Sequence, residues 1–353
     1  MANIKAGINP QRDYRILQTG LTPDLASPYA PVPVVTPEPC REIMKLSIVT
    51  TLYCSSRYIH EFYERISTQA RLVTDRYEII FVNDGSPDNS LEVAKKIGAS
   101  DACVKVIDLS RNFGHHRAMM CGLGYTSGTR VFLIDVDLEE QPEALGEFWR
   151  EMDADPELDI VIGELEEKPA PFFKKGSSEA FYKAFNALSS VKISSRDMVS
   201  RLMTRGYVDA LLQYHEKEIF FPAIWEDVGF KQKRLRATKS FDGFTTYTLR
   251  KKLVMAFNAI TSFSSKPLIY ISYLGLLFSM SSLAFMALLV IRRLSGQDVM
   301  LGWTSMIAVV FLIGGIIMFA LGLVGIYISK IYDQVKGRPN VIVKRVYSAN
   351  NGQ

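Results

Sequence analysis

Four short apolar runs, separated by segments with helical spacing, constrain the fold of this chain most strongly. The spacing of apolar residues predicts helices over residues 57–73, up to 97 and through 125. The apolar runs themselves predict strands over residues 45–53, 77–82, 104–109 and 131–134. Strands that alternate with helices of this length indicate βαβ units, in which the strands form a parallel sheet. We therefore expect an α/β fold.

Two carboxylates follow the fourth of these strands. Residues 131–134 are a continuous apolar run, which is typical of a strand buried on both faces. Asp135 and Asp137 are one residue apart, so they point to the same side where the strand ends. Their mutual repulsion favours a bound cation, and hard oxygen ligands suit Mg²⁺ or Mn²⁺. The alternative is that both cap a helix that starts near Pro142.

The composition limits the classes of function. The chain has 353 residues, of which 48% are hydrophobic and 22% charged, and its net charge of +4 is too small to indicate nucleic-acid binding. Its four cysteines form no C-x-x-C pair, so neither a disulfide framework nor a zinc site is indicated. The N-terminus lacks a signal-peptide pattern, and residues 1–44 are a proline-rich stretch that predicts an extended tail.

Two long apolar blocks near the C-terminus predict membrane spans. Residues 267–291 and 303–328 are nearly free of charge over lengths that can cross a bilayer. Basic residues outside this hairpin outnumber Arg292 and Arg293 within it, so we expect both termini to be cytosolic. Residues 230–266 are basic and interleaved with aromatics, which indicates an interfacial amphipathic segment or, alternatively, the solvated face of an ordinary helix. Glycines in the second span make a homo-oligomer an expectation.

Between the Asp pair and the spans, the sequence predicts less regular structure. It predicts a strand over residues 158–162, a loop over 164–176 that could close over a site, and a helix over 178–188. A short strand over 201–204 and a helix over 207–214 follow. We assign His115 and His116 to a helix start and not to a metal site, because neither has a carboxylate or thiol at ligand spacing.

The order of motifs resembles the family 2 glycosyltransferases of the GT-A fold that load a sugar onto polyprenyl phosphate, such as bactoprenol glucosyltransferases and dolichol-phosphate mannose synthases. The resemblance covers nearly everything from residue 45 to about residue 343. The matching segments are residues 82–88 (Val-Asn-Asp-Gly-Ser-Pro-Asp), 109–114 (Leu-Ser-Arg-Asn-Phe-Gly), 135–139 (Asp-Val-Asp-Leu-Glu), 181–186, 201–205 (Arg-Leu-Met-Thr-Arg), 241–267 and 336–339 (Lys-Gly-Arg-Pro).

This resemblance implies roles for particular residues. Asp135 and Asp137 match the family's cation-binding pair, with Glu139 as a third metal contact or a helix cap. The donor nucleotide sugar would contact Asp135 and the residues Thr51, Tyr53, Asp84, Arg111 and Asn112. Arg201 and Arg205 are expected partners of the acceptor phosphate, since guanidinium groups match phosphate oxygens.

The catalytic step is expected to depend on Asp137, Asp197 and Arg201. The sequence departs from the family at Val199, where relatives carry an Asp proposed as a base; Asp197, two residues earlier, is the candidate here. Residues 51–55 and the acidic stretch after residue 164 also depart from the family pattern, so donor choice can differ.

The implied protein is a membrane-bound, inverting, Mg²⁺- or Mn²⁺-dependent enzyme of the bacterial plasma membrane. It would move a sugar from a UDP-sugar, such as UDP-glucose, to undecaprenyl phosphate for cell-envelope glycans. The expected parts are a tail (1–44), a GT-A domain (45–229), a juxtamembrane segment (230–266), a two-helix transmembrane hairpin (267–329) and a cytosolic tail (330–353). A processive polysaccharide synthase and a non-catalytic membrane scaffold remain alternatives.

Overall fold

The computed structural model describes residues 45–165, 186, 192–194, 196–217, 219–237, 261, 266–295 and 303–349. Four predicted features lie wholly or mostly outside these residues. They are the tail over 1–44, the loop over 164–176, the helix over 178–188 and the amphipathic segment beyond residue 237.

The core of the fold is a mostly parallel sheet, as the alternating pattern predicted. Eight described strands run in the order β7-β5-β6-β4-β1-β2-β3-β8. The central four, β1 (Leu46–Leu52), β2 (Tyr77–Asn83), β3 (Val104–Leu109) and β4 (Arg130–Leu133), are parallel. Strand β6 (Asp197–Thr204) is antiparallel to β4 and to β5 (Ile160–Leu165). The carboxyl ends of the four parallel strands therefore meet at one edge of the sheet.

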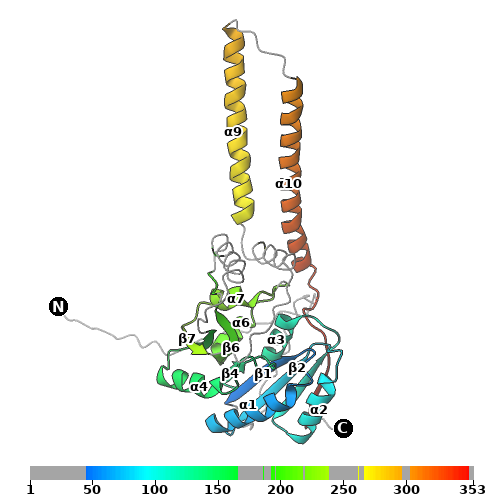
Figure 1. Ribbon diagram of the computed structural model, residues 1–353, viewed down its shortest axis with the longest axis vertical. Helices are drawn as coiled ribbons and strands as arrows, with labels where there is room; N and C mark the ends of the chain where they lie inside the picture. The colour runs from blue at the N-terminus through cyan, green and yellow to red at the C-terminus, as the bar shows by residue number, and fades with distance from the viewer. Residues whose placement is uncertain are drawn as a thin grey trace, which may run out of the picture. The chain divides into compact units, whose positions relative to one another are not determined.

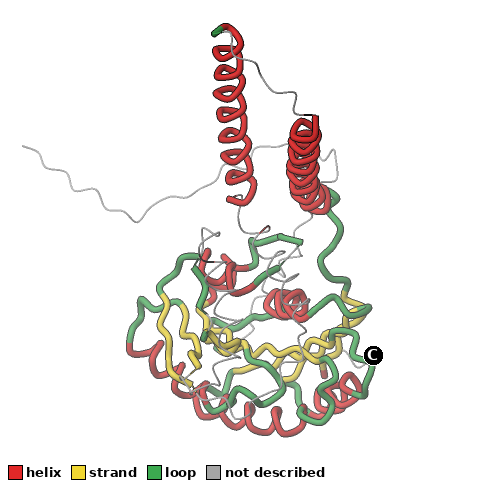
Figure 2. The backbone as a smooth tube through the Cα atoms, turned by 45° about the horizontal axis from the view of Figure 1, so that its top comes forward, coloured by secondary structure: helices red, strands yellow, loops and turns green. Residues whose placement is uncertain are grey.

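Helices cover both faces of this sheet and enclose two apolar cores (Figure 2). One core lies against α1 (Ile59–Val73), α2 (Ser90–Ser100) and α4 (Ala144–Ala154). The other lies against α3 (His115–Gly124), α6 (Arg205–Leu211) and α7 (Phe221–Asp227). Strands β1 and β2 have every residue buried, because helices pack on both of their faces.

The two edge strands come from segments that we expected outside the catalytic domain. Strand β7 (Gln232–Ala237) lies beyond the expected boundary at residue 229 and pairs with β5. Strand β8 (Val343–Ser348) belongs to the expected cytosolic tail and pairs antiparallel with β3. Both are rich in Lys and Arg, which is common on sheet edges and hides the strand pattern in the sequence. The sheet thus includes two strands beyond residue 229, the predicted C-terminal limit of the domain.

Two long helices, α9 (Lys266–Leu294) and α10 (Trp303–Val335), follow the sheet's main body (Figure 1). Within the described residues, one stretch, Leu312–Val335 in α10, is long and apolar enough to cross a membrane. The apolar stretch Lys266–Phe278 in α9 is shorter. The prediction of two spans is therefore supported for the second span only.

Candidate active site

The ends of β1 and β4 meet the start of α3 through a chain of three side chains. Thr51 Oγ1 and His115 Nδ1 are hydrogen bonded at 2.9 Å. The other ring nitrogen, Nε2, lies 3.4 Å from Asp135 Oδ1. A predicted donor contact and a predicted metal ligand are thus joined by a histidine for which the sequence predicts only a helix start. His115 is indeed the first residue of α3, but nothing in the sequence spacing reveals its two partners.

Asp84 holds the neighbouring loop in place. Its buried carboxylate, just after β2, accepts hydrogen bonds from the backbone N–H of Phe113 at 2.7 Å and of Gly114 at 3.0 Å. Gly85 has a φ of +60°, and a Cβ there would lie 2.5 Å from backbone atoms of Arg111 and Asn112. The structure therefore brings Asp84 against the 111–114 loop.

Other predicted donor contacts border the same edge. The Arg111 and Asn112 side chains are exposed, and the Arg111 guanidinium lies over the Phe113 ring. Tyr53 is 52% exposed directly after β1. The following residue, Cys54, donates its backbone N–H to Ser86 Oγ at 2.8 Å, which ties the end of β1 to the turn after β2.

The acidic loop after β4 is a turn and not a helix cap. Asp137 Oδ1 accepts the backbone N–H of Glu139 at 3.0 Å, and the intervening Leu138 has a φ of +60°. Helix α4 begins later, with Glu143 at its N-cap position. The capping alternative for Asp135 and Asp137 is therefore wrong.

Glu140, which the sequence did not single out, anchors this loop. The residue is 3% exposed, and its carboxylate accepts the backbone N–H groups of Val199 at 3.0 Å and Ser200 at 2.6 Å. In a run of four acids within six residues, no periodicity indicates which one turns inward. Glu140 fixes the acidic loop to β6 and so limits where Asp137 and Glu139 can lie.

The acidic loop offers hard oxygen ligands for a divalent cation. Among the described residues no three His, Cys, Asp or Glu side chains converge into a complete metal cage. Mg²⁺ at phosphate-binding sites usually takes one or two carboxylates, with waters and substrate phosphates completing its octahedron. Asp135 and Asp137, with Glu139 adjacent, fit such a partly protein-built site.

Arg201 does not reach the surface as its predicted phosphate contact requires. Its side chain is fully buried and donates to the carbonyls of Met198 at 2.6 Å and Val199 at 3.0 Å. The guanidinium lies over the Trp225 ring, and burial lowers its pKa to about 10. The structure therefore contradicts the prediction that Arg201 binds the acceptor phosphate, and it gives this residue a place in the core.

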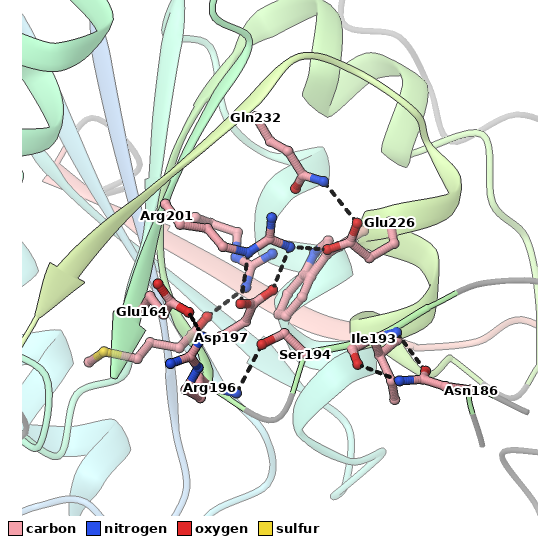
Figure 3. A network of polar contacts seen from close by, with 12 residues as sticks. Glu164, Asn186, Ile193, Ser194, Arg196, Asp197, Arg201, Glu226 and Gln232 are labelled. Carbon is pink, nitrogen blue, oxygen red and sulfur yellow. Dashed lines mark hydrogen bonds and ion pairs between the residues drawn. The ribbon is translucent and has the colours of Figure 1, made fainter. Parts of the chain in front are cut away.

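Asp197 is engaged in a charged cluster (Figure 3). Its two carboxylate oxygens accept hydrogen bonds from Arg234 Nε at 3.0 Å and Arg234 Nη2 at 3.1 Å. Arg234 also pairs with Glu226, which in turn accepts Gln232 Nε2 at 2.8 Å. This cluster joins β6, β7 and α7. Both carboxylate oxygens of Asp197 are thus engaged by Arg234, so the assignment of Asp197 as a base is not supported.

Arg205 lies at the opposite end of the sheet from Asp135. Its guanidinium donates to the carbonyl of Gly128 and to Thr126 Oγ1, in the turn before β4. The reason is the direction of β6: its register pairs Thr204 with Arg130, at the amino end of β4. The predicted phosphate contact of Arg205 is therefore wrong.

Comparisons with known proteins identify the family. Residues 47–212 match the model described as glycosyl transferase family 2. The chain is 41% identical to a Mycobacterium tuberculosis protein named as a glycosyltransferase, over 87% of this chain and 90% of that protein. It is 34% identical to the uncharacterised glycosyltransferase YkcC of Bacillus subtilis, over 87% of this chain and 96% of that one.

A further relative carries a more specific name. The SfII prophage-derived bactoprenol glucosyl transferase of Shigella flexneri is 29% identical over 87% of this chain and 100% of its own length. These matches cover 87% of this chain, so they extend well beyond residue 212. With its GT-A-like, mostly parallel sheet, this chain is a glycosyltransferase that belongs to glycosyl transferase family 2.

Proposed function

We propose that the chain transfers a sugar from a UDP-sugar, such as UDP-glucose, to a polyprenyl phosphate at a membrane, with inversion at the anomeric carbon. One observation carries this proposal: the apolar helix α10 ends at Val335, and the chain returns from it into the catalytic sheet at Val343. A catalytic sheet that is joined by so short a connector to an apolar helix suits an acceptor that is itself a lipid. The named bactoprenol glucosyl transferases add support, because their full length is covered.

In this proposal the donor lies along the carboxyl edge of β1, β2 and β4. Asp84 orients the 111–114 loop against the nucleoside, while Thr51 and Tyr53 border the same pocket. Asp135 and Asp137, with Glu139, would hold Mg²⁺ or Mn²⁺. Such an ion supplies Lewis-acid stabilisation of the negative charge that develops on the leaving diphosphate.

The acceptor needs little activation by the protein. A phosphate monoester is already an anion near neutral pH, so a strong general base is less necessary than for an alcohol. This agrees with the engagement of Asp197 by Arg234. The residues at the site would therefore act mainly by positioning donor and acceptor in line.

We also propose the setting of this reaction. The enzyme would lie in a bacterial plasma membrane with α9 as a second span, the catalytic sheet and both termini in the cytosol, and homo-oligomers in the bilayer. The basic residues flanking the helices support this orientation.

The test uses the purified full-length chain in nanodiscs with undecaprenyl phosphate, Mn²⁺ and a panel of labelled nucleotide sugars. A lipid-linked sugar from at least one donor is the expected result, and none from any donor would refute the proposal. Asp137→Asn should lower transfer by about 100-fold or more and weaken Mn²⁺-dependent donor binding, since it removes a metal-binding charge. A scaffold without catalysis would show neither transfer nor this loss.

A further inference from the structure

Three basic side chains from separate segments gather where α10 ends. Arg117 is in the first turn of α3, Lys217 is in the loop after α6, and Arg338 is in the connector between α10 and β8. Arg117 Nη2 donates to the backbone carbonyl of Lys217 at 2.6 Å. Lys217 Nζ donates to Asn340 Oδ1 at 3.1 Å, two residues from Arg338.

The loop that carries Lys217 is fixed from two sides. The Gln334 side chain accepts from Lys217 N at 3.1 Å and donates to His215 O at 3.1 Å, while Asn340 Nδ2 donates to Glu216 O at 3.2 Å. On the other side, His116 Nδ1 donates to Ile219 O at 3.0 Å. These contacts join α10 and its connector to α3, so the fold holds Arg117 against the loop of Lys217, and the connector places Arg338 close enough to act on the charge of Lys217.

The three basic side chains are not matched by ion-paired carboxylates within the part of the chain that the structure describes. No carboxylate there forms an ion pair with Arg117, Lys217 or Arg338. Burial lowers the pKa of Lys217, and the charges of Arg117 and Arg338 lower it further, with Asp333 opposing them. A bound anion would offset this repulsion.

The position of the cluster indicates which anion it would bind. Arg117 is two residues from His115, which contacts Asp135 at the sugar-transfer edge. The other side of the cluster borders the end of the apolar stretch Leu312–Val335. An anion bound here lies between the candidate active site and the membrane surface. The buried Arg201 and the distant Arg205 leave this border without the phosphate contacts that the sequence predicted.

We propose that Arg117, Lys217 and Arg338 form a subsite that receives the phosphate headgroup of the lipid acceptor as it enters from the membrane. This rests on the proposed transfer to a lipid phosphate. Two guanidinium groups and an ammonium supply charge-assisted donors for phosphate oxygens. The fixed loop holds these donors in place before the acceptor arrives, which reduces the ordering cost of binding.

The test compares Arg117→Gln and Arg338→Gln with the control Arg345→Gln in the full-length chain. Arg345 is an exposed arginine on β8 that lies by Tyr347, outside the cluster. The KM for polyprenyl phosphate should rise about tenfold or more in each cluster variant, because each loses a charge-assisted contact with phosphate. The KM for the donor and the Mn²⁺-dependent donor affinity should stay within about twofold, and the control should match the parent chain.

A second arm separates the acceptor phosphate from general attraction to an anionic bilayer. Transfer is measured with a water-soluble short-chain prenyl phosphate, in neutral detergent without anionic lipid. The KM defect should persist there, and inorganic phosphate should inhibit the parent chain more strongly than the Arg117→Gln, Arg338→Gln double variant. A defect seen only in anionic bilayers would overturn the subsite, as would an unchanged acceptor KM.

Failure of the subsite is distinguishable from failure of the proposed function. If the parent chain transfers no sugar to any prenyl phosphate, the proposed function fails. If the parent transfers sugar and the cluster variants do so with its acceptor KM, the proposed function stands and the subsite is wrong. Donor binding reports whether each variant is folded.

Discussion

His115, the first residue of α3, links the end of β1 to the loop after β4 at the candidate active site. Its ring contacts Thr51 on one side and Asp135 on the other, so it orients a candidate metal ligand without needing to bind the metal itself. Groups that orient metal ligands commonly contribute 10- to 100-fold to metal affinity. The neutral ring can do this with a single N–H directed at the carboxylate.

Replacing His115 with Ala should weaken Mn²⁺ binding by about 10- to 100-fold, because Asp135 loses its neighbour. Titration of Mn²⁺ by electron paramagnetic resonance, in the presence of UDP, measures this affinity directly. His116→Ala is the matched control: His116 donates to Ile219 O and packs edge-on against Phe221, away from Asp135. Equal losses of Mn²⁺ affinity in both variants would mean that the effect is general destabilisation of α3.

The sequence predicted the positions of those site residues that directly follow a strand. Asp84, Asp135 and Asp137 each follow a parallel strand, so the chain's own pattern indicated that they share an edge. Arg205 was misassigned because β6 is antiparallel, so that its last residues reach the amino end of β4. Arg201 pairs with Leu133 at the carboxyl end of β4, and it was misassigned because its side chain is fully buried. Glu140 and His115 were missed because their roles depend on partners about 60 residues away along the chain.

Strand β6 is the element that connects the parallel half of the sheet to β5 and β7. Its backbone N–H groups donate to Glu140 of the acidic loop, and its Asp197 belongs to the charged cluster. Arg234 is held in this cluster by two carboxylates, and its hydrogen bonds with Asp197 are the largest cause of its raised pKa. We therefore attribute to Asp197 a structural role in fixing β7 beside β5.

Asp197→Asn should lower stability by about 1–3 kcal/mol and slow turnover by less than about tenfold, because it breaks a partly buried ion pair and not a proton transfer. Thermal unfolding of the full-length chain and a transfer assay measure the two quantities. Arg234→Gln should destabilise similarly, and the double variant should lose less than the sum. Turnover that slows by about 10²- to 10⁴-fold without loss of stability would restore Asp197 as a general base.

The amino ends of β1 and β2 are joined by the buried carboxylate of Glu78. Burial acts to raise its pKa, but Lys105 and hydrogen bonds from Ser47 and Ser127 outweigh burial and lower the pKa below its ordinary value. A carboxyl group whose pKa is lower in the folded chain contributes stability above its unfolded pKa. That contribution is lost as the pH falls through the folded pKa.

The melting temperature should therefore fall between about pH 5 and pH 3, and Glu78→Gln should flatten part of this slope while lowering stability at pH 7. Thermal unfolding of the parent chain and of Glu78→Gln across pH 3–7 measures how each melting temperature depends on pH. Glu92→Gln is a suitable control, since Glu92 pairs only with Lys95 on the exposed face of α2 among the residues that the structure describes. Parallel pH profiles for the parent chain and Glu78→Gln would contradict this account.

At the scale of the whole molecule, the last described strand, β8, completes the sheet. Strand β8 covers the outer edge of β3 and pairs Ile107 with Val346 and Lys105 with Ser348. The sequence did not predict this closure, because charged edge strands lack the apolar pattern that marks buried ones. The catalytic sheet is consequently built from residues on both sides of α9 and α10.

A chain that ends at Asn340 should have a melting temperature lower by about 4 °C or more and should aggregate on concentration, because the edge of β3 loses its ladder of hydrogen bonds. Thermal unfolding and light scattering in detergent measure the two effects. A chain that ends at Ala349 retains β8 and should match the parent. Unchanged stability of the shorter chain would mean that β8 adds no stability to the sheet.

The late position of β8 also sets the order of events during synthesis. A ribosome adding 5–20 residues per second takes roughly 12–47 seconds to extend the chain from the end of β3 to the start of β8. During that interval the edge of β3 is bare while the apolar helices emerge. Completion of the sheet therefore follows synthesis of those helices, so the fully formed enzyme first exists after both apolar helices have been made.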